Sequence, residues 1–283
     1  MINPLLIKAI KKANQIRTRL GLDMFEPVNI FDACLDLDVT LRFVDINMEG
    51  MYISQNNGKN STILLSNQRP LPRRCYTCAH ELGHHVFGHG NSLDALHTDD
   101  SSSNNQDEFL VDAFAGALLM PIAGVQAEFS SRNWNPQDAS PIQFYVIASV
   151  FGTGYSTLIT HCKLNRLLSE NEAKLLLKST PAKILESLLG KNIINSYFKI
   201  IDSYFSKSII DIEVSNYIFL PQTTKVEGSQ LKEYKKTDIG SSYIAIKPGI
   251  VRATSEGKSY FIRIQNSGYV GLSENRHLEN IID

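Results

Sequence analysis

Residues 75–89 read CYTCAHELGHHVFGH, and residues 80–84 within them fit the pattern H-E-x-x-H. Positions four apart lie on one face of an α-helix, so the imidazoles of His80 and His84 can bind a single metal ion. Glu81 is then placed beside such an ion, where it can take a proton from a water molecule. The alternative, from these five residues alone, is a helix rich in His and Glu that merely faces solvent.

The composition of the chain is that of an ordinary globular protein. It has 283 residues, of which 43% are hydrophobic and 20% charged, and its formal net charge is -1. This length allows two domains, or one domain with a sizeable appendage. A charge so close to zero gives no general basis for binding nucleic acid or a membrane surface.

The sequence contains no apolar run that we interpret as a membrane span, and its N-terminus is typical of an amphipathic helix rather than a signal peptide. The cysteines form no regular framework, as expected in a reducing compartment. We therefore expect a cytoplasmic protein with no membrane partner. The four cysteines are Cys34, Cys75, Cys78 and Cys162.

Hydrophobic periodicity predicts the elements around the H-E-x-x-H pattern. A small antiparallel sheet is expected before the helix that carries the pattern, and Pro72 is well placed in the first turn of that helix. Upstream, helices are predicted over residues 4–20 and 29–35, and strands over residues 39–46, 50–54 and 61–65, with a loop containing Asn57-Gly58. Downstream, a polar surface loop is predicted over residues 91–106, followed by an apolar helix over residues 107–121.

Two carboxylates interrupt the downstream helix, Glu108 and Asp112, which lie four residues apart. The helix is otherwise so apolar that it is expected to be buried, and a buried charge is costly unless it is paired or bound to a metal. Two carboxylates at this spacing also repel each other. A cation bound by Glu108, with Asp112 holding a nearby histidine, would relieve both the cost of burial and this repulsion. The alternative is that Glu108 is an exposed carboxylate at a helix N-terminus.

A catalytic zinc needs about three protein ligands and one open position. The candidates for the third ligand are His85, His89, His97, the loop aspartates and Glu108. The extended pattern H-E-x-x-H-x-x-G-x-x-H fails, since Phe87 and Gly90 stand where it requires Gly and His. His85 is predicted to point away from the face of the two histidines, and Glu108 is the choice held on a rigid helix. The predicted ligands are His80, His84 and Glu108, with Glu81 as the base and Asp112 in a supporting role.

Cys75 and Cys78 stand directly before the histidines in a Cys-x-x-Cys pair, which can bind zinc or exchange disulfides. No second Cys pair completes a structural zinc site. We therefore expect Cys78 to pack in the core and Cys75 to be partly exposed, and a redox switch on this helix is a hypothesis only.

Two blocks of the sequence resemble the ImmA/IrrE family of metallopeptidases: RRCYTCAHELGHH at residues 73–85 and EFLVDAFAGALLMP at residues 108–121. The resemblance covers roughly residues 5–170. It implies a zinc-dependent, thermolysin-like minimal peptidase domain. Family members typically cleave helix-turn-helix repressors encoded nearby, so the expected partner is a protein substrate of that kind.

The chain departs from many relatives at Leu110, where they carry a second Glu. If that second Glu were the family's metal ligand, this site would be damaged. The Glu108-x-x-x-Asp112 spacing instead matches the third-ligand helix of thermolysin-like enzymes, which is why Glu108 is retained.

The remaining sequence predicts two further regions. Residues 141–168 are typical of a helix, a tight turn and a helix; DNA binding is possible but not favoured, because the second helix carries Lys163 and Arg166 without a basic stripe. Residues 171–206 are predicted to be helical. From residue 209 the chain alternates between short β-rich runs and turns, with strands predicted over residues 211–214, 216–221, 242–247, 258–264 and 268–272.

The sequence therefore predicts an α+β protein with three regions. These are a zinc metallopeptidase core of the minimal zincin type over residues 1–135, a helical connector over 136–206 and a β-rich domain over 207–283. The expected function is zinc-dependent cleavage of a regulatory protein. The alternative is a non-catalytic regulator that uses the same fold to bind a partner protein or DNA.

Overall fold

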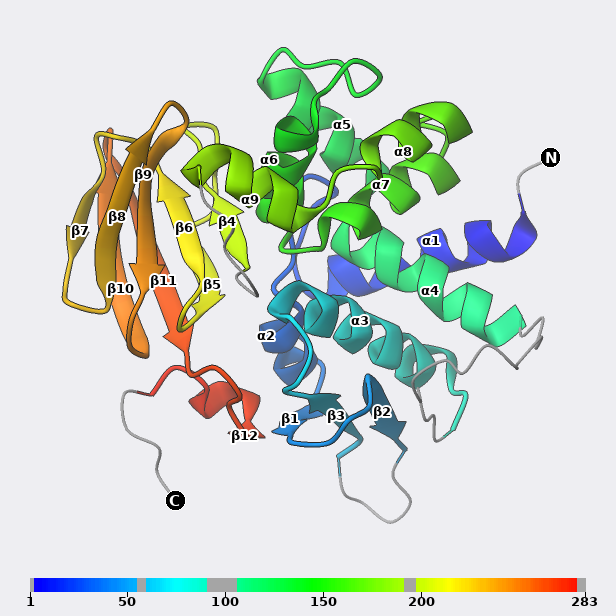
Figure 1. Ribbon diagram of the computed structural model, residues 1–283. Helices are drawn as coiled ribbons and strands as arrows, with labels where there is room; N and C mark the ends of the chain where they lie inside the picture. Colours follow the sequence, from blue (N-terminus) through cyan, green and yellow to red (C-terminus); the bar gives the residue numbers. More distant parts are fainter. Residues whose placement is uncertain (1–2, 55–59, 91–105, 191–196, 279–283) are drawn as a thin grey trace. The chain divides into compact units, whose positions relative to one another are not determined.

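The computed structural model (Figure 1) describes residues 3–54, 60–90, 106–190 and 197–278. The chain divides into two compact units, Met1–Val125 with Gly268–Glu274, and Gln126–Ser267 with Asn275–Asp283. Helices and small sheets occur in separate runs along the chain, so the predicted α+β class is confirmed. The predicted boundaries after residues 135 and 206 stay predictions. The predicted Asn57-Gly58 loop and nearly all of the polar loop lie outside the described residues.

The first unit combines helices with one sheet. The sequence pattern located these elements well, since each predicted helix and strand of this unit has a counterpart within a few residues. The elements are α1 (Pro4–Arg19), α2 (Ile30–Asp36), β1 (Thr40–Val44), β2 (Gly50–Ile53), β3 (Thr62–Ser66), α3 (Leu71–Phe87), α4 (Gln106–Leu119) and β12 (Gly271–Leu272).

The sheet of this unit is mixed, so the predicted antiparallel sheet is wrong in this detail. Its strand order is β12-β1-β3-β2. β2 and β3 form an antiparallel pair, but β3, which lies between β1 and β2, is parallel to β1. β12, from the far end of the chain, adds to the other side of β1. These pairings leave β2 at one edge of the sheet.

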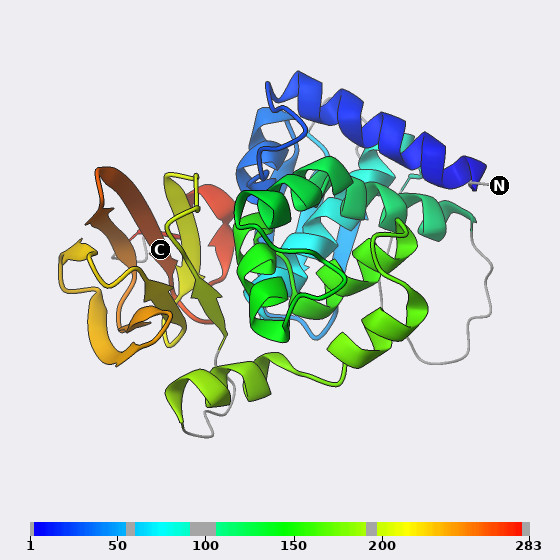
Figure 2. The ribbon, with the colours of Figure 1, turned by 90° about the horizontal axis from the view of Figure 1, so that it is seen from above.

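Three helices pack together in this unit, with α4 against both α1 and α3. Figures 1 and 2 show α1 lying alongside α4. Arg17 fixes this arrangement: its guanidinium is buried and donates to backbone carbonyls, including that of Leu118 at 2.6 Å, which lies at the end of α4. A buried charge needs such partners to offset the loss of water.

The segment Gln106–Ser131 is long and apolar enough to cross a membrane by length and composition alone. Seventy-two per cent of its most apolar stretch is buried inside the protein, as in the core helix of a globular domain. The next two helices reach this length and apolarity only when taken together, and they are bent by 94° at the break between them.

Among its described residues, the second unit contains most of α5 (Ile122–Ser131), four further helices and two sheets. The sheets have the orders β5-β11-β10-β7 and β4-β6-β9-β8. The helices are α6 (Pro141–Phe151), α7 (Tyr155–Leu164), α8 (Glu170–Leu176) and α9 (Pro181–Leu189). The strands are β4 (Phe198–Ile200), β5 (Ile209–Glu213), β6 (Tyr217–Leu220), β7 (Lys225–Glu227), β8 (Leu231–Thr237), β9 (Gly240–Ala245), β10 (Gly249–Ser255) and β11 (Lys258–Gln265).

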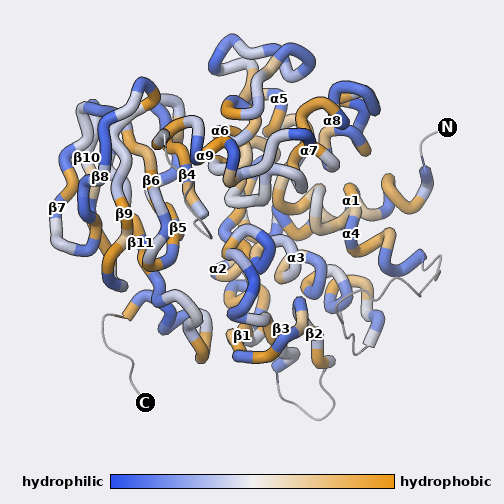
Figure 3. Tube along the Cα trace, viewed as in Figure 1, coloured by the Kyte–Doolittle hydropathy of each residue, from blue (hydrophilic) through white to orange (hydrophobic). Residues whose placement is uncertain are grey.

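The predicted helix over residues 171–206 is wrong at its end, because Phe198–Ile200 form strand β4, parallel to β6. All three residues of β4 are buried, which suits a strand covered on both faces rather than an amphipathic helix. The charged strand β8 was not predicted. Five consecutive residues of it are exposed, and Figure 3 shows it as largely hydrophilic, as expected of an edge strand protected from pairing with other chains.

Candidate metal centre

Helix α3 places His80 and His84 on one buried face. Leu71 and Pro72 open the helix, and Gly88 ends it in the left-handed conformation, with φ of 72°. Between these ends the helix is regular, so residues four apart are neighbours. The two imidazole rings meet edge to face with their centroids 5.0 Å apart, as the H-E-x-x-H spacing predicts.

Glu108, in the first turn of α4, completes a group of three donors. Nε2 of His80 lies 3.2 Å from Nε2 of His84 and 3.2 Å from Oε2 of Glu108. Oε1 of Glu108 lies 3.5 Å from Nε2 of His84. Ligands about 2.0–2.2 Å from a tetrahedral zinc are separated from one another by roughly 3.3–3.6 Å. His80, His84 and Glu108 each offer one ligand atom, these atoms lie within 4.8 Å of one another, and the three side chains could hold a metal ion.

The electrostatics of this group also favour a cation. Burial lowers the pKa of His80, but hydrogen bonds to Asp112 and Glu108 outweigh burial and raise this pKa to about 10. Burial, followed by the charge on His80, lowers the pKa of His84 to about 4. The hydrogen bond with His80 lowers the pKa of the Glu108 carboxyl. Near neutral pH His80 therefore carries a proton that faces the Glu108 carboxylate, and a metal ion would replace this proton as the partner of the carboxylate.

Asp112 contacts the other side of the same ring. Nδ1 of His80 donates to Oδ1 of Asp112 at 2.9 Å, which leaves Nε2 to face the other two donors. The predicted burial of the two carboxylates is wrong, because the side chains of Glu108 and Asp112 are 44% and 56% exposed. Both lie at the edge of the apolar helix rather than in its core, so an unpaired charge there would cost less than the sequence argument assumed.

Tyr76 was missed by the sequence analysis. Its hydroxyl donates to the Asp112 backbone carbonyl at 3.2 Å. Burial raises the pKa of Tyr76 well above its usual range, and the charge of Asp112 raises it further. Tyr76 precedes His80 by four residues and so shares its helix face, which is the signal that would have identified it.

Glu81 belongs to α3, and its side chain is fully buried against the start of the edge strand β2. The close approach depends on Gly50, because a Cβ atom there would lie 3.2 Å from Cγ of Glu81 and 2.6 Å from Cγ2 of Thr77. The first residue of β2 thus passes directly over the helix turn that carries Glu81.

The other residues weighed as ligands are placed differently. Nδ1 of His85 lies 3.0 Å from the hydroxyl of Tyr52, so the prediction that His85 points away is confirmed. His89 lies against His84 through its Nδ1 atom and does not belong to the three-donor group. His97 and the loop aspartates between residues 91 and 105 lie outside the described residues.

The cysteine predictions are confirmed, since Cys78 is buried and Cys75 is partly exposed. The Sγ atoms of Cys34 and Cys78 are 3.5 Å apart. Burial, together with Cys34, raises the pKa of the Cys78 thiol well above its usual value. A protonated, buried thiol is a poor nucleophile and metal ligand, so packing accounts for Cys78.

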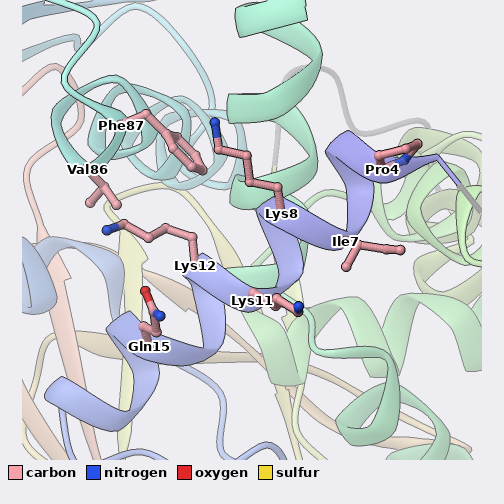
Figure 4. A pocket seen from close by; sticks show the side chains of 8 residues that line it. All are labelled: Pro4, Ile7, Lys8, Lys11, Lys12, Gln15, Val86 and Phe87. Atoms are coloured by element: carbon pink, nitrogen blue, oxygen red, sulfur yellow. The ribbon is translucent and has the colours of Figure 1, made fainter.

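A separate hollow of about 570 Å³ lies in the same unit between α1 and the end of α3 (Figure 4). None of the three donors, nor Glu81, lines it. Figure 4 shows lysine side chains of α1 around it, with Phe87 of α3 between them. Its lining includes Lys8, Lys11, Lys12, Gln15, Val86 and Phe87.

Comparison with known proteins agrees with this geometry. Residues 34–162 match the family model described as the IrrE N-terminal-like domain, Peptidase_M78. These residues are similar to an IrrE N-terminal-like domain. The resemblance inferred from the two sequence blocks is therefore confirmed. No curated protein matches the chain.

The IrrE-like domain extends from α2 to α7 and includes all three donors, Glu81 and Asp112. The match indicates a metallopeptidase-like domain. It leaves α1, α8, α9 and the strands β4 to β12 outside and covers less than half of the chain.

Proposed function

We propose that this protein is a zinc-dependent endopeptidase of the cytoplasm that cleaves a regulatory protein, such as a helix-turn-helix repressor encoded near its own gene. His80, His84 and Glu108 hold the zinc, Glu81 is the general base, and Asp112 orients His80. The single observation that carries this proposal is that the three side chains each offer one ligand atom, and that these atoms lie within 4.8 Å of one another. That spacing suits a tetrahedral site with a fourth position left open.

Glu81 is the residue that moves the proton. When bound, zinc supplies a Lewis acid that polarises the scissile carbonyl and makes a water molecule acidic at neutral pH. Glu81 accepts a proton from the attacking water and delivers it to the departing amine. Its burial suits this role, because a carboxylate shielded from solvent is a stronger base than one in water.

The edge strand β2 is the proposed place for the substrate backbone. β2 pairs with β3 on one side and is last in the sheet order. An extended peptide that adds to such an edge forms backbone hydrogen bonds with the strand. Because Gly50 lets the start of β2 approach Glu81 closely, a peptide along this edge would pass near the proposed base.

A protein substrate is favoured over DNA as the partner. Every residue from Phe144 to Phe151 of α6 is buried, so this helix serves the core of its unit. On α7, Lys163 is paired with Glu170 at 3.3 Å, which reduces the positive charge available to phosphates. The repressor itself is proposed on the family resemblance alone.

The test uses the purified full-length chain with zinc content and cleavage measured together. The substrate is a small repressor encoded beside the gene, followed by gel electrophoresis and mass spectrometry. Glu81→Gln is expected to retain zinc and to lower cleavage by about 10²–10⁴-fold, the usual contribution of a general base. His84→Ala and Glu108→Ala are expected to lose zinc.

Three outcomes contradict specific parts of the proposal. Cleavage by a zinc-loaded Glu81→Gln variant at the normal rate would remove Glu81 as the base. Full zinc occupancy in His84→Ala or Glu108→Ala would remove that residue from the ligand set. Binding of the repressor without cleavage by zinc-loaded wild type would favour a non-catalytic regulator.

A further inference from the structure

The end of helix α3 folds back on the metal-binding face. Gly88 has φ of 72° and ψ of 35°, and its N–H donates to the carbonyl of His85 at 3.2 Å. The N–H of His89 donates to the carbonyl of His84 at 3.1 Å. These two bonds define a Schellman motif, in which the residue after the glycine contacts the helical residue five positions before it. Here that pair is His89 and His84.

The contact between the two rings is polar as well as apolar. Nδ1 of His89 lies 3.3 Å from Nδ1 of His84, and the ring centroids are 5.4 Å apart. The ring of Phe87 stacks on His89 with an interplanar angle of 20°. The His89 side chain is only 16% exposed. Packing therefore holds this imidazole in place against His84.

The chemistry of a metal ligand assigns the protons in this contact. Nε2 of His84 faces His80 and Glu108, so it must carry its lone pair towards the ion, and the ring proton must lie on Nδ1. Nδ1 of His84 then donates to Nδ1 of His89. His89 in turn carries its proton on Nε2, which lies 3.6 Å from Oδ1 of Asp107.

We propose that His89 is a positioning residue for His84, with Asp107 behind it. This inference rests on the proposed zinc site. The two histidine ligands are then oriented in different ways: His80 donates directly to the carboxylate of Asp112, whereas His84 reaches the carboxylate of Asp107 through a second imidazole. Asp107 and Glu108 are adjacent in the first turn of α4, so one turn supplies both a ligand and the end of this chain of polar contacts.

The experiment measures zinc affinity by chelator competition in the full-length protein. His89→Ala is expected to weaken zinc binding by about 10–100-fold, as is usual when the partner of a ligating histidine is removed. His89→Asn is expected to stay within a few-fold of wild type, because its amide oxygen can accept from Nδ1 of His84 in place of the imidazole. Asp107→Asn combined with His89→Ala is expected to add little, since both act through one chain of contacts.

Two further measurements separate positioning from a general loss of structure. The melting temperature of the metal-free variants is expected to match that of wild type. The visible absorption of bound Co²⁺ is expected to change in His89→Ala and to be restored in His89→Asn. His85→Ala is the matched control, because it removes the neighbouring histidine of the same helix end, which faces Tyr52, and is expected to leave the zinc affinity unchanged.

The outcomes distinguish this inference from the proposed function. If wild type binds zinc and His89→Ala binds it equally well, the positioning role is wrong and the zinc site stands. If His89→Asn is as weak as His89→Ala, the hydrogen bond to His84 is wrong. If wild type binds no zinc, the proposed function fails and this inference fails with it.

Discussion

Oδ1 of Asp112 accepts a hydrogen bond from Nδ1 of His80 at 2.9 Å, and this contact decides which nitrogen of His80 faces the other ligands. The bond joins α4 to α3 at the point where Glu108, one turn earlier in α4, meets the same imidazole. A carboxylate in this position fixes the tautomer and raises the basicity of a metal-binding histidine.

Asp112→Ala is therefore expected to weaken zinc binding by about 10–100-fold. Because the Asp112 side chain is 56% exposed, the melting temperature of the metal-free protein should change little. Chelator competition and a thermal melt measure the two quantities. Asp36→Ala, which removes an exposed carboxylate at the end of α2, is the control, and equal zinc affinity in the Asp112 and Asp36 variants would contradict this role.

Zinc binding is expected to release about one proton at pH 6. The pKa of His80 is raised to about 10 and that of His84 is lowered to about 4, so at this pH His80 is protonated and His84 is not. The zinc affinity should therefore fall about tenfold for each unit by which the pH decreases from 6 to 5. Calorimetry in two buffers of different ionisation enthalpy counts the protons. A titration that releases none at pH 6 would show that His80 is neutral before zinc binds.

Gly50→Ala is expected to destabilise the first unit by about 1–3 kcal/mol, the usual cost of overpacking a close contact. The new methyl group would lie 2.6 Å from Cγ2 of Thr77, so the edge strand or the helix must move. Thr77→Ser removes that Cγ2 atom and should recover part of the loss in the double variant, while Cγ of Glu81 at 3.2 Å limits the recovery. Urea unfolding measures the free energy of unfolding of Gly50→Ala, of Thr77→Ser and of the double variant. Wild-type stability in Gly50→Ala alone would refute the proposed close approach.

Acid is expected to weaken the second unit at Asp211, whose side chain is 12% exposed. Burial raises the pKa of Asp211, but the paired Arg263 and the nearby Arg276 outweigh it and hold this pKa well below the usual value. The guanidinium of Arg263 contacts both carboxylate oxygens, at 2.6 and 2.8 Å. A lowered folded-state pKa gives stability that is present above the unfolded pKa of about 3.9 and is lost as the pH falls below it.

Hydrogen exchange of the β5 and β11 amides, measured by mass spectrometry between pH 5 and 3, tests this expectation. Protection should fall with pH in wild type, after correction for the intrinsic exchange rate. Asp211→Asn should cost about 3–5 kcal/mol at neutral pH, because it removes the negative charge that Arg263 and Arg276 face, and its protection should depend less on pH. Asp238→Asn, at an exposed position, is the control.

The sequence by itself determined the elements of the first unit and the predicted ligand set. Helical geometry fixes which residues share a face, so the spacing of His80 and His84 and that of Glu108 and Asp112 were sufficient to propose one site from two helices. Pro72 and Gly88 likewise mark the ends of α3 through backbone constraints that act locally.

The tertiary structure decided what depends on contacts between distant residues. Local periodicity states that a face is apolar, but not which surface covers it. The sequence therefore could not show that β12 pairs with β1, that Phe198–Ile200 is a strand beside β6, or that Glu108 and Asp112 lie at an exposed edge. The same limit applies to His89, which the sequence offered only as a possible ligand. Its contact with His84 combines the local turn at Gly88 with the packing of Phe87 against Phe114 of α4, which only the tertiary structure provides.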